Sequence, residues 1–173
     1  MLSHHLIERI VKVRFFIMDV DGILTDGRII YDNKGNGYKF FDVKDGFGIA
    51  LLRRAGIESA IITAKKSKAV ARRAKDFKLK YLYQNCHDKL KTFSELSDRL
   101  SLRPENICYM GDDLLDMPVM KRVGFAVSVP DAVEEAQGAA HYVTQRRGGR
   151  GAVREVCDLI IKTQGKWDEI VKY

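Results

Sequence analysis

Short apolar runs alternate with longer amphipathic segments along the whole chain of 173 residues. Short apolar runs bounded by polar residues indicate buried strands, whereas apolar residues spaced three and four positions apart indicate helices that cover them. The pattern predicts strands at residues 15–19, 59–63, 81–83, 107–110, 125–129 and 141–143. It predicts helices at residues 46–55, 66–77, 89–100, 114–122, 132–137 and 152–163.

The regular order of these elements predicts the fold class. Strands that alternate with helices through short links form a parallel sheet with helices on both faces. Internal repeats, linkers and low-complexity segments are absent from the sequence. We therefore expect residues 1–173 to form a single α/β domain with a doubly wound parallel sheet.

One segment interrupts the alternation directly after the first strand. Two runs rich in apolar and aromatic residues, 28–31 and 38–41, flank a polar, glycine-containing loop at 32–37. This pattern is typical of a β-hairpin with a long loop. Because an isolated hairpin is only marginally stable in water, we expect this one to pack against a partner such as another subunit.

Composition restricts the class of protein. The chain is 46% hydrophobic and 31% charged, which is typical of globular domains. Its apolar runs are much shorter than the roughly 20 residues that span a bilayer, and its first residues do not resemble a secretory signal. Three scattered cysteines fit reduced thiols better than disulfides or a zinc site. We expect a cytoplasmic protein without a membrane partner.

A net charge of +7 raises the question of nucleic-acid binding. Much of the positive charge lies in one helix, at residues 65–80, and in a glycine-rich segment at residues 146–151. Aromatic residues that would stack on bases do not interleave with the second cluster. A small phosphorylated or carboxylated substrate explains the charge as well as RNA does, and we expect no nucleic-acid partner.

Two carboxylates mark the end of the first strand. Asp19 and Asp21 project the same way from an apolar strand, since side chains alternate along it. Close carboxylates repel one another and need a cation or a shared proton between them. A turn with a polar cap is the simpler alternative. An EF-hand loop is excluded, because Ile23 and Leu24 occupy positions where ligands would be needed.

Further polar groups follow other predicted strands. Thr63 ends the second strand, Lys89 opens the helix after the third, and an acidic segment at 111–116 follows the fourth. Singly, each is explained by a helix cap or a surface position, but together they lie at the strand ends where α/β proteins bind ligands. Carboxylates can bind Mg²⁺ and attack phosphorus, and a lysine and a hydroxyl can bind phosphate oxygens. This set of groups predicts phosphoryl transfer.

The order of these motifs resembles that of haloacid dehalogenase superfamily phosphatases. The resemblance implies that Asp19 is the nucleophile and Asp21 the general acid and base. It implies that Asp19, the backbone carbonyl of Asp21 and the side chain of Asp112 hold Mg²⁺. Thr63 and Lys89 would then bind the phosphoryl group.

The two remaining aspartates of the acidic segment have supporting roles in this resemblance. Asp113 and Asp116 would orient Lys89 and the water molecules around the metal.

Within that superfamily the chain is most similar to the 3-deoxy-D-manno-octulosonate 8-phosphate phosphatase family. Four segments carry the similarity: residues 19–27, 44–49, 109–120 and 147–155. The resemblance implies hydrolysis of this sugar-acid phosphate in lipopolysaccharide precursor synthesis, with no large cap domain. It also implies a homotetramer whose hairpins form a barrel between subunits.

The same resemblance implies the residues that contact the substrate. They are Asp45, Gly46, Lys65 and Arg150. The glycine–arginine segment 146–151 would be a flexible tail that closes over a neighbouring subunit's site. Truncation before Arg146 is therefore expected to impair substrate handling more than folding.

One departure from the family bears on the substrate. The family commonly has the pair Gly-Arg directly after its threonine. Members that act on a nine-carbon sugar acid phosphate tend to have glutamate at the second position of that pair. In this chain the pair is Ala64-Lys65. Lys65 keeps the positive charge, which favours the eight-carbon substrate, but it lacks the bidentate fork of arginine. Alternatively, Lys65 has no role in substrate binding and is the first residue of a solvated basic helix.

Three other functions compete with this one. The first is a phosphatase for a nine-carbon ketodeoxy acid 9-phosphate. The second is a phospho-acceptor signalling domain, against which Asp21 argues because it supplies an acid for turnover. The third is a non-hydrolytic oligomerisation domain, which the intact motifs oppose.

Overall fold

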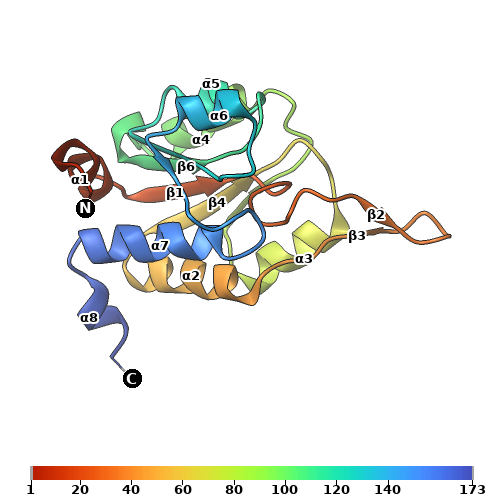
Figure 1. The fold of residues 1–173 in the computed structure, drawn as a ribbon, viewed down its shortest axis with the longest axis horizontal. Helices are drawn as coiled ribbons and strands as arrows, with labels where there is room; N and C mark the ends of the chain where they lie inside the picture. Colours follow the sequence, from red (N-terminus) through yellow and green to blue (C-terminus); the bar gives the residue numbers. More distant parts are fainter. Residues whose placement is uncertain (1, 173) are drawn as a thin grey trace.

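A computed structural model describes residues 2–172 and contains one six-stranded sheet (Figure 1). Its strands are β1 (Phe15–Met18), β4 (Glu58–Ile62), β5 (Tyr81–Tyr83), β6 (Ile107–Met110), β7 (Phe125–Ser128) and β8 (Tyr142–Val143). The strand order is β5-β4-β1-β6-β7-β8, and every neighbouring pair is parallel. All six predicted strands are confirmed, each within one residue at either end.

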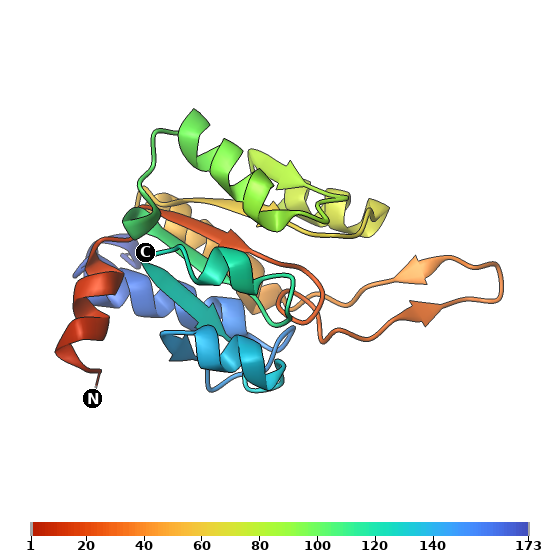
Figure 2. The same ribbon diagram turned by 90° about the horizontal axis from the view of Figure 1, so that it is seen from above.

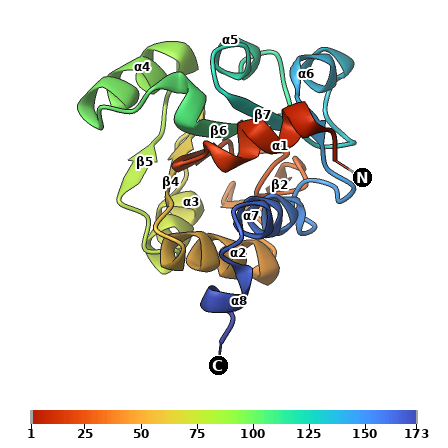
Figure 3. The same cartoon turned by 90° about the vertical axis from the view of Figure 1, so that its left-hand side faces the viewer.

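Helices cover both faces of this sheet. They are α1 (His4–Val11), α2 (Val43–Arg54), α3 (Lys68–Asp76), α4 (Lys89–Arg99), α5 (Met117–Met120), α6 (Glu134–Ala139), α7 (Ala152–Thr163) and α8 (Trp167–Ile170). A short 3₁₀ helix spans Pro104–Asn106. Helices α4, α5 and α6 lie on one face, and α2, α3 and α7 lie on the other (Figure 3). The predicted doubly wound α/β fold is confirmed.

The alternation of side chains along the strands divides the core in two. Phe16 and Met18 of β1 pack with α2, α3 and α7, whereas Phe15 and Ile17 pack with α4, α5 and α6. Every residue of β1, β6 and β7 is buried, as expected for parallel strands covered on both faces. These strands therefore give the residues that follow them a rigid base.

Helix boundaries differ from the prediction where side chains cap backbone groups. Helix α2 begins three residues early because the Asp42 side chain accepts a hydrogen bond from Lys44 N. Helix α5 is shorter than predicted because the backbone before it turns around the Asp116 side chain. The apolar pattern does not predict α1 and α8, although Ser3 caps α1.

The predicted hairpin is present and projects far from the body of the molecule (Figure 2). Its paired strands, β2 (Ile30–Tyr31) and β3 (Gly37–Tyr38), are shorter than the predicted runs. Asp32 organises the loop by accepting hydrogen bonds from Lys34 N at 2.9 Å and Asn36 N at 2.8 Å. No large cap domain accompanies the sheet in residues 2–172, and no helix there is both long and apolar enough to span a bilayer.

Candidate active site

The carboxyl ends of three neighbouring strands meet at one small pocket. Asp19 follows β1, Thr63 follows β4, and the acidic segment follows β6, while α4 begins at the pocket with Lys89. The pocket has a volume of about 160 Å³. Its lining consists of Asp19, Asp21, Thr63, Ala64, Lys65, Lys89, Asp112, Asp113, Leu115 and Asp116. The structure thus brings the predicted phosphoryl-transfer residues together.

Lys89 lines this pocket and is only 3% exposed. Its Nζ atom is 2.6 Å from Asp116 Oδ1 and 3.0 Å from Asp19 Oδ1. Burial lowers the pKa of Lys89, but attraction to Asp19 and Asp116 outweighs burial and raises the pKa above its usual value. A buried ammonium is costly without such partners. Lys89 is therefore a fixed positive charge.

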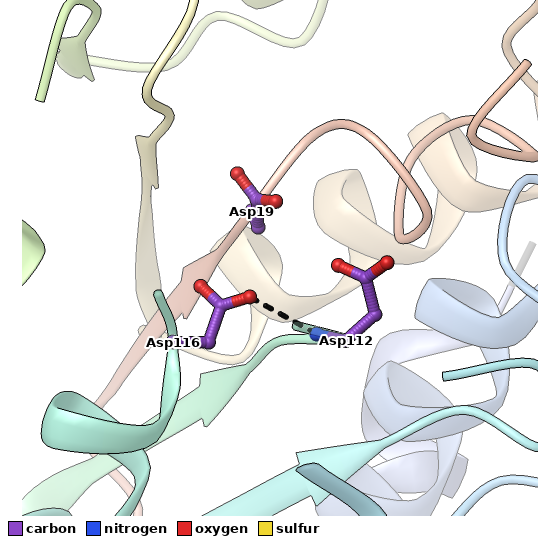
Figure 4. Close-up of side chains that lie close together, drawn as sticks. All are labelled: Asp19, Asp112 and Asp116. Atoms are coloured by element: carbon purple, nitrogen blue, oxygen red, sulfur yellow. Dashed lines mark hydrogen bonds between the residues drawn. The ribbon is translucent and has the colours of Figure 1, made fainter. Parts of the chain in front are cut away.

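Asp116 is fully buried and accepts hydrogen bonds on both carboxylate oxygens. Oδ1 accepts from Lys89 Nζ and from the Tyr109 hydroxyl, at 2.6 and 2.5 Å. Oδ2 accepts from the backbone N–H group of Asp112 at 3.1 Å (Figure 4). It also accepts from the backbone N–H group of Asp113 at 3.2 Å. Asp116 thus joins the acidic loop to Lys89, which supports the predicted orienting role.

Asp113 contributes to the shape of the same loop. Its side chain is exposed, and its Oδ1 atom accepts a hydrogen bond from Leu114 N at 2.7 Å. The role of Asp113 in orienting water molecules around a metal stays a prediction.

The donor set of the pocket fits a divalent cation. Carboxylate oxygens of Asp19, Asp112 and Asp116 lie within 4.8 Å of one another. Asp112 Oδ1 is buried and has no hydrogen-bond partner among the described residues. Burial and then Asp116 raise the pKa of Asp19 to about 7, and burial and then Asp19 raise the pKa of Asp112 to about 8. Lys89 alone therefore does not balance these carboxylates, whose hard oxygen atoms suit Mg²⁺.

A glycine lets the two acidic loops approach each other. A Cβ atom on Gly22 would lie 1.9 Å from Asp112 Oδ2, and the φ of Gly22 is 87°. The Asp112 carboxylate therefore lies directly against the loop that carries Asp21. Asp19, Asp21 and Asp112 all line the pocket, and their assignment as the metal ligand set stays a prediction.

Asp21 has a partner that the sequence pattern does not suggest. Its side chain is 27% exposed and forms an ion pair with Lys39, from the returning segment of the hairpin. Lys39 belongs to none of the motifs, and only the path of the hairpin brings it to Asp21. Spacing along the chain carries no signal for this contact, because the two residues meet through tertiary structure alone.

Lys65 is exposed and lies where the pocket opens. It also lines an adjoining groove of about 440 Å³ between the hairpin and the start of α3. Four other cationic residues line this groove: Arg28, Lys39, Lys66 and Lys68. The groove therefore presents positive charge next to the pocket, as an anionic substrate would require.

Asp45 and Gly46 do not line the pocket. Asp45 is fully buried, and its Oδ1 atom accepts a hydrogen bond from Arg154 N at 2.8 Å, at the start of α7. Burial raises the pKa of Asp45 to about 6. A Cβ atom on Gly46 would lie 2.5 Å from Phe77 Cε1. Both residues pack α2 against its neighbours in this chain, and their contact with substrate stays a prediction.

The glycine–arginine segment also differs from its prediction. Gly149 N donates a hydrogen bond to Ile23 O at 2.8 Å, and a Cβ atom on Gly148 would lie 1.7 Å from Gly22 O. Arg150 lies outside the 160 Å³ pocket, with Nη2 3.5 Å from Asp26 Oδ2. The segment is therefore packed against its own chain, which argues against a flexible tail, and its closure over a neighbouring subunit's site stays a prediction.

The expected effect of truncation before Arg146 is wrong for the same reason. Helix α7 follows this segment and contributes Val153, Val156, Ile160 and Ile161 to the core. Removing these side chains would cost several kcal/mol of burial. Truncation there would impair folding first.

Comparison with known proteins assigns the family. A family model described as haloacid dehalogenase-like hydrolase matches residues 49–156. The chain belongs to this hydrolase family. The predicted family and the prediction that the chain is an enzyme are both confirmed.

Named relatives are similar over nearly the whole chain. The 3-deoxy-D-manno-octulosonate 8-phosphate phosphatase of Salmonella typhi is 47% identical over 97% of this chain and 89% of the relative. The structure of the Yersinia pestis enzyme of that name has a TM-score of 0.94 and 45% identity, and covers 96% of this chain and 90% of that one.

A third relative was solved with bound molecules. The Moraxella catarrhalis phosphatase of the same name, in complex with a magnesium ion, a phosphate ion and a KDO molecule, has a TM-score of 0.95 and 39% identity. The match covers 98% of both chains.

Proposed function

We propose that this hydrolase cleaves 3-deoxy-D-manno-octulosonate 8-phosphate to 3-deoxy-D-manno-octulosonate and phosphate, with Mg²⁺ as cofactor. The observation that carries the proposal is the pocket in which Asp19, Lys89 and Asp112 meet. The names of the relatives and the bound molecules of the Moraxella protein support the substrate and the metal.

Asp19 and Asp21 divide the chemistry between them. In the first step an Asp19 oxygen attacks phosphorus, the bond from phosphorus to the sugar oxygen breaks, and Asp21 gives that oxygen a proton. In the second step Asp21 takes a proton from water, whose oxygen attacks phosphorus and releases Asp19 and phosphate. Lys89 and Thr63 bind the phosphoryl oxygens, and Mg²⁺ would neutralise their negative charge.

The substrate beyond the phosphoryl group would lie in the basic groove. Lys65 lines both the pocket and the groove, so it is placed to attract a sugar-acid carboxylate. The Ala64-Lys65 pair leaves a nine-carbon ketodeoxy acid 9-phosphate as the second candidate. We also propose a homotetramer joined through the exposed apolar residues of the hairpin.

A phosphate-release screen over sugar phosphates, with and without Mg²⁺, tests the proposal. We expect Mg²⁺-dependent release that is fastest with the eight-carbon acid phosphate. A clear preference for the nine-carbon substrate would contradict the assignment. Stable phosphorylation of the protein without release would favour a phospho-acceptor domain, and no reaction at all would favour an oligomerisation domain.

A further inference from the structure

Tyr109, to which the motifs assign no role, contacts the carboxylate that holds Lys89. Tyr109 is the third residue of β6 and is fully buried, with its ring in the core between the sheet and α4, α5 and α6. Its hydroxyl donates a hydrogen bond to Asp116 Oδ1 at 2.5 Å. The ring is fixed by the sheet, so the hydroxyl holds Asp116 at a set position.

The same oxygen of Asp116 also accepts a hydrogen bond from Lys89 Nζ at 2.6 Å. The lysine side chain is long and flexible, and its ammonium needs contacts to define its place. Strand β6, the acidic loop and α4 therefore meet at a single carboxylate oxygen. The negative charge of that oxygen is shared between the tyrosine hydroxyl and the lysine ammonium. Asp116 therefore holds the ammonium less tightly than it would if the hydroxyl were absent.

We propose that Tyr109 is a positioning residue, whose hydroxyl acts through Asp116 to set the place of Lys89 Nζ and its strength of phosphoryl binding. The inference rests on the proposed function, in which Lys89 binds the phosphoryl group. Without the hydroxyl, Asp116 would draw Lys89 toward itself and away from the phosphoryl group.

The test is Tyr109→Phe, which removes the hydroxyl and keeps the ring. Binding of inorganic phosphate in saturating Mg²⁺ is measured by calorimetry, and KM and kcat are measured with an aryl phosphate. We expect the phosphate Kd and the KM to rise about 3- to 10-fold, with a smaller change in kcat, as for one lost hydrogen bond. The Mg²⁺ concentration for half-maximal activity should stay within about twofold.

Tyr142→Phe is the matched control. The Tyr142 hydroxyl also donates a hydrogen bond to a carboxylate, Glu155 Oε1 at 2.8 Å, away from the pocket. This variant should keep the phosphate Kd of the unmodified protein. Equal losses in the two variants, or an unchanged Kd in Tyr109→Phe, would overturn the proposal, as would loss of the fold in Tyr109→Phe.

A double-mutant cycle tests the route through Asp116. In an Asp116→Ala background, which removes the shared acceptor, Tyr109→Phe should have no further effect on phosphate binding, whereas additive effects would overturn the route. Measurements on the unmodified protein distinguish failure of the proposed function from failure of the role proposed for Tyr109. Phosphate binding without any hydrolysis would refute the proposed function alone, and absence of phosphate binding would refute both.

Discussion

Two aspartates that are neighbours on one strand end have different surroundings. The Asp19 side chain is 9% exposed and pairs with Lys89, whereas the Asp21 side chain is 27% exposed and pairs with Lys39. Different environments allow two carboxylates to take different roles in one reaction. In the proposed mechanism the buried Asp19 would attack phosphorus, and the more open Asp21 would exchange a proton with substrate or water.

Asp19→Asn should abolish phosphate release and leave the fold intact. The amide has the size of the carboxylate but cannot attack phosphorus, so we expect a loss of at least about a thousandfold. Phosphate release and far-UV circular dichroism measure the two effects. Asp98→Asn, an exposed change on α4, is the control. Activity near that of the control would contradict the nucleophilic role.

Mg²⁺ binding should release protons near neutral pH. The pKa values of about 7 for Asp19 and about 8 for Asp112 mean that both carboxyls are largely protonated at about pH 6 without metal. A metal ion binds the ionised forms, so the apparent Mg²⁺ affinity should rise between about pH 6 and 8 and level off above. Calorimetry in buffers of different ionisation enthalpy counts the protons, and a pH-independent affinity would contradict the prediction.

At the scale of elements, the hairpin reaches the active site through Lys39. Lys39→Met should raise the KM about tenfold, because it removes a positive charge beside the phosphate pocket. Lys34→Met, an exposed change in the hairpin loop, is the matched control. Kinetics with the sugar-acid phosphate measure both variants, and equal values would show that Lys39 does not serve the reaction.

The glycine–arginine segment depends on Gly149 for its close packing. Its φ is 64°, and a Cβ atom would lie 2.4 Å from the carbonyl carbon of Thr25. Gly149→Ala should lower the free energy of unfolding by about 2 kcal/mol, from backbone strain and this overlap. Gly35 has a similar φ of 80°, but a Cβ atom there would meet no neighbouring atom. Gly35→Ala therefore measures the cost of backbone strain without overlap. Urea unfolding measures both variants, and equal losses of unfolding free energy in Gly149→Ala and Gly35→Ala would contradict a packing role for Gly149.

The elements and residues that could be predicted are those whose signal is local. Six strands and the pocket residues Asp19, Thr63, Lys89 and Asp112 could be found, because apolar runs and strand ends are visible in the chain itself. Contacts made through tertiary structure could not be found in this way. Burial of Asp45 under α7 and the approach of Lys39 to Asp21 depend on how helices and the hairpin pack.

At the scale of the whole molecule, the order of the strands in the sheet determines where the pocket residues meet. Strand β1 lies between β4 and β6, so the chain winds to one side of β1 and then to the other. Such a switch point opens a crevice at the carboxyl ends of the strands. Asp19 is thereby flanked by Thr63 from β4 and by Asp112 from β6. The topology alone brings the proposed nucleophile, a hydroxyl and an acidic loop together.

The hairpin should determine the oligomeric state. Its exposed apolar residues include Ile29, Tyr31, Tyr38 and Phe40, with exposures from 51% to 69%. Apolar side chains on a projecting hairpin favour burial between subunits. Ile29→Ser with Phe40→Ser should therefore convert the proposed tetramer to a 19.7 kDa monomer in light scattering after size exclusion. Val11→Ser, an exposed apolar change on α1, should keep the tetramer. An unmodified protein that is monomeric at micromolar concentration would contradict the assembly, and the hairpin would then need another partner.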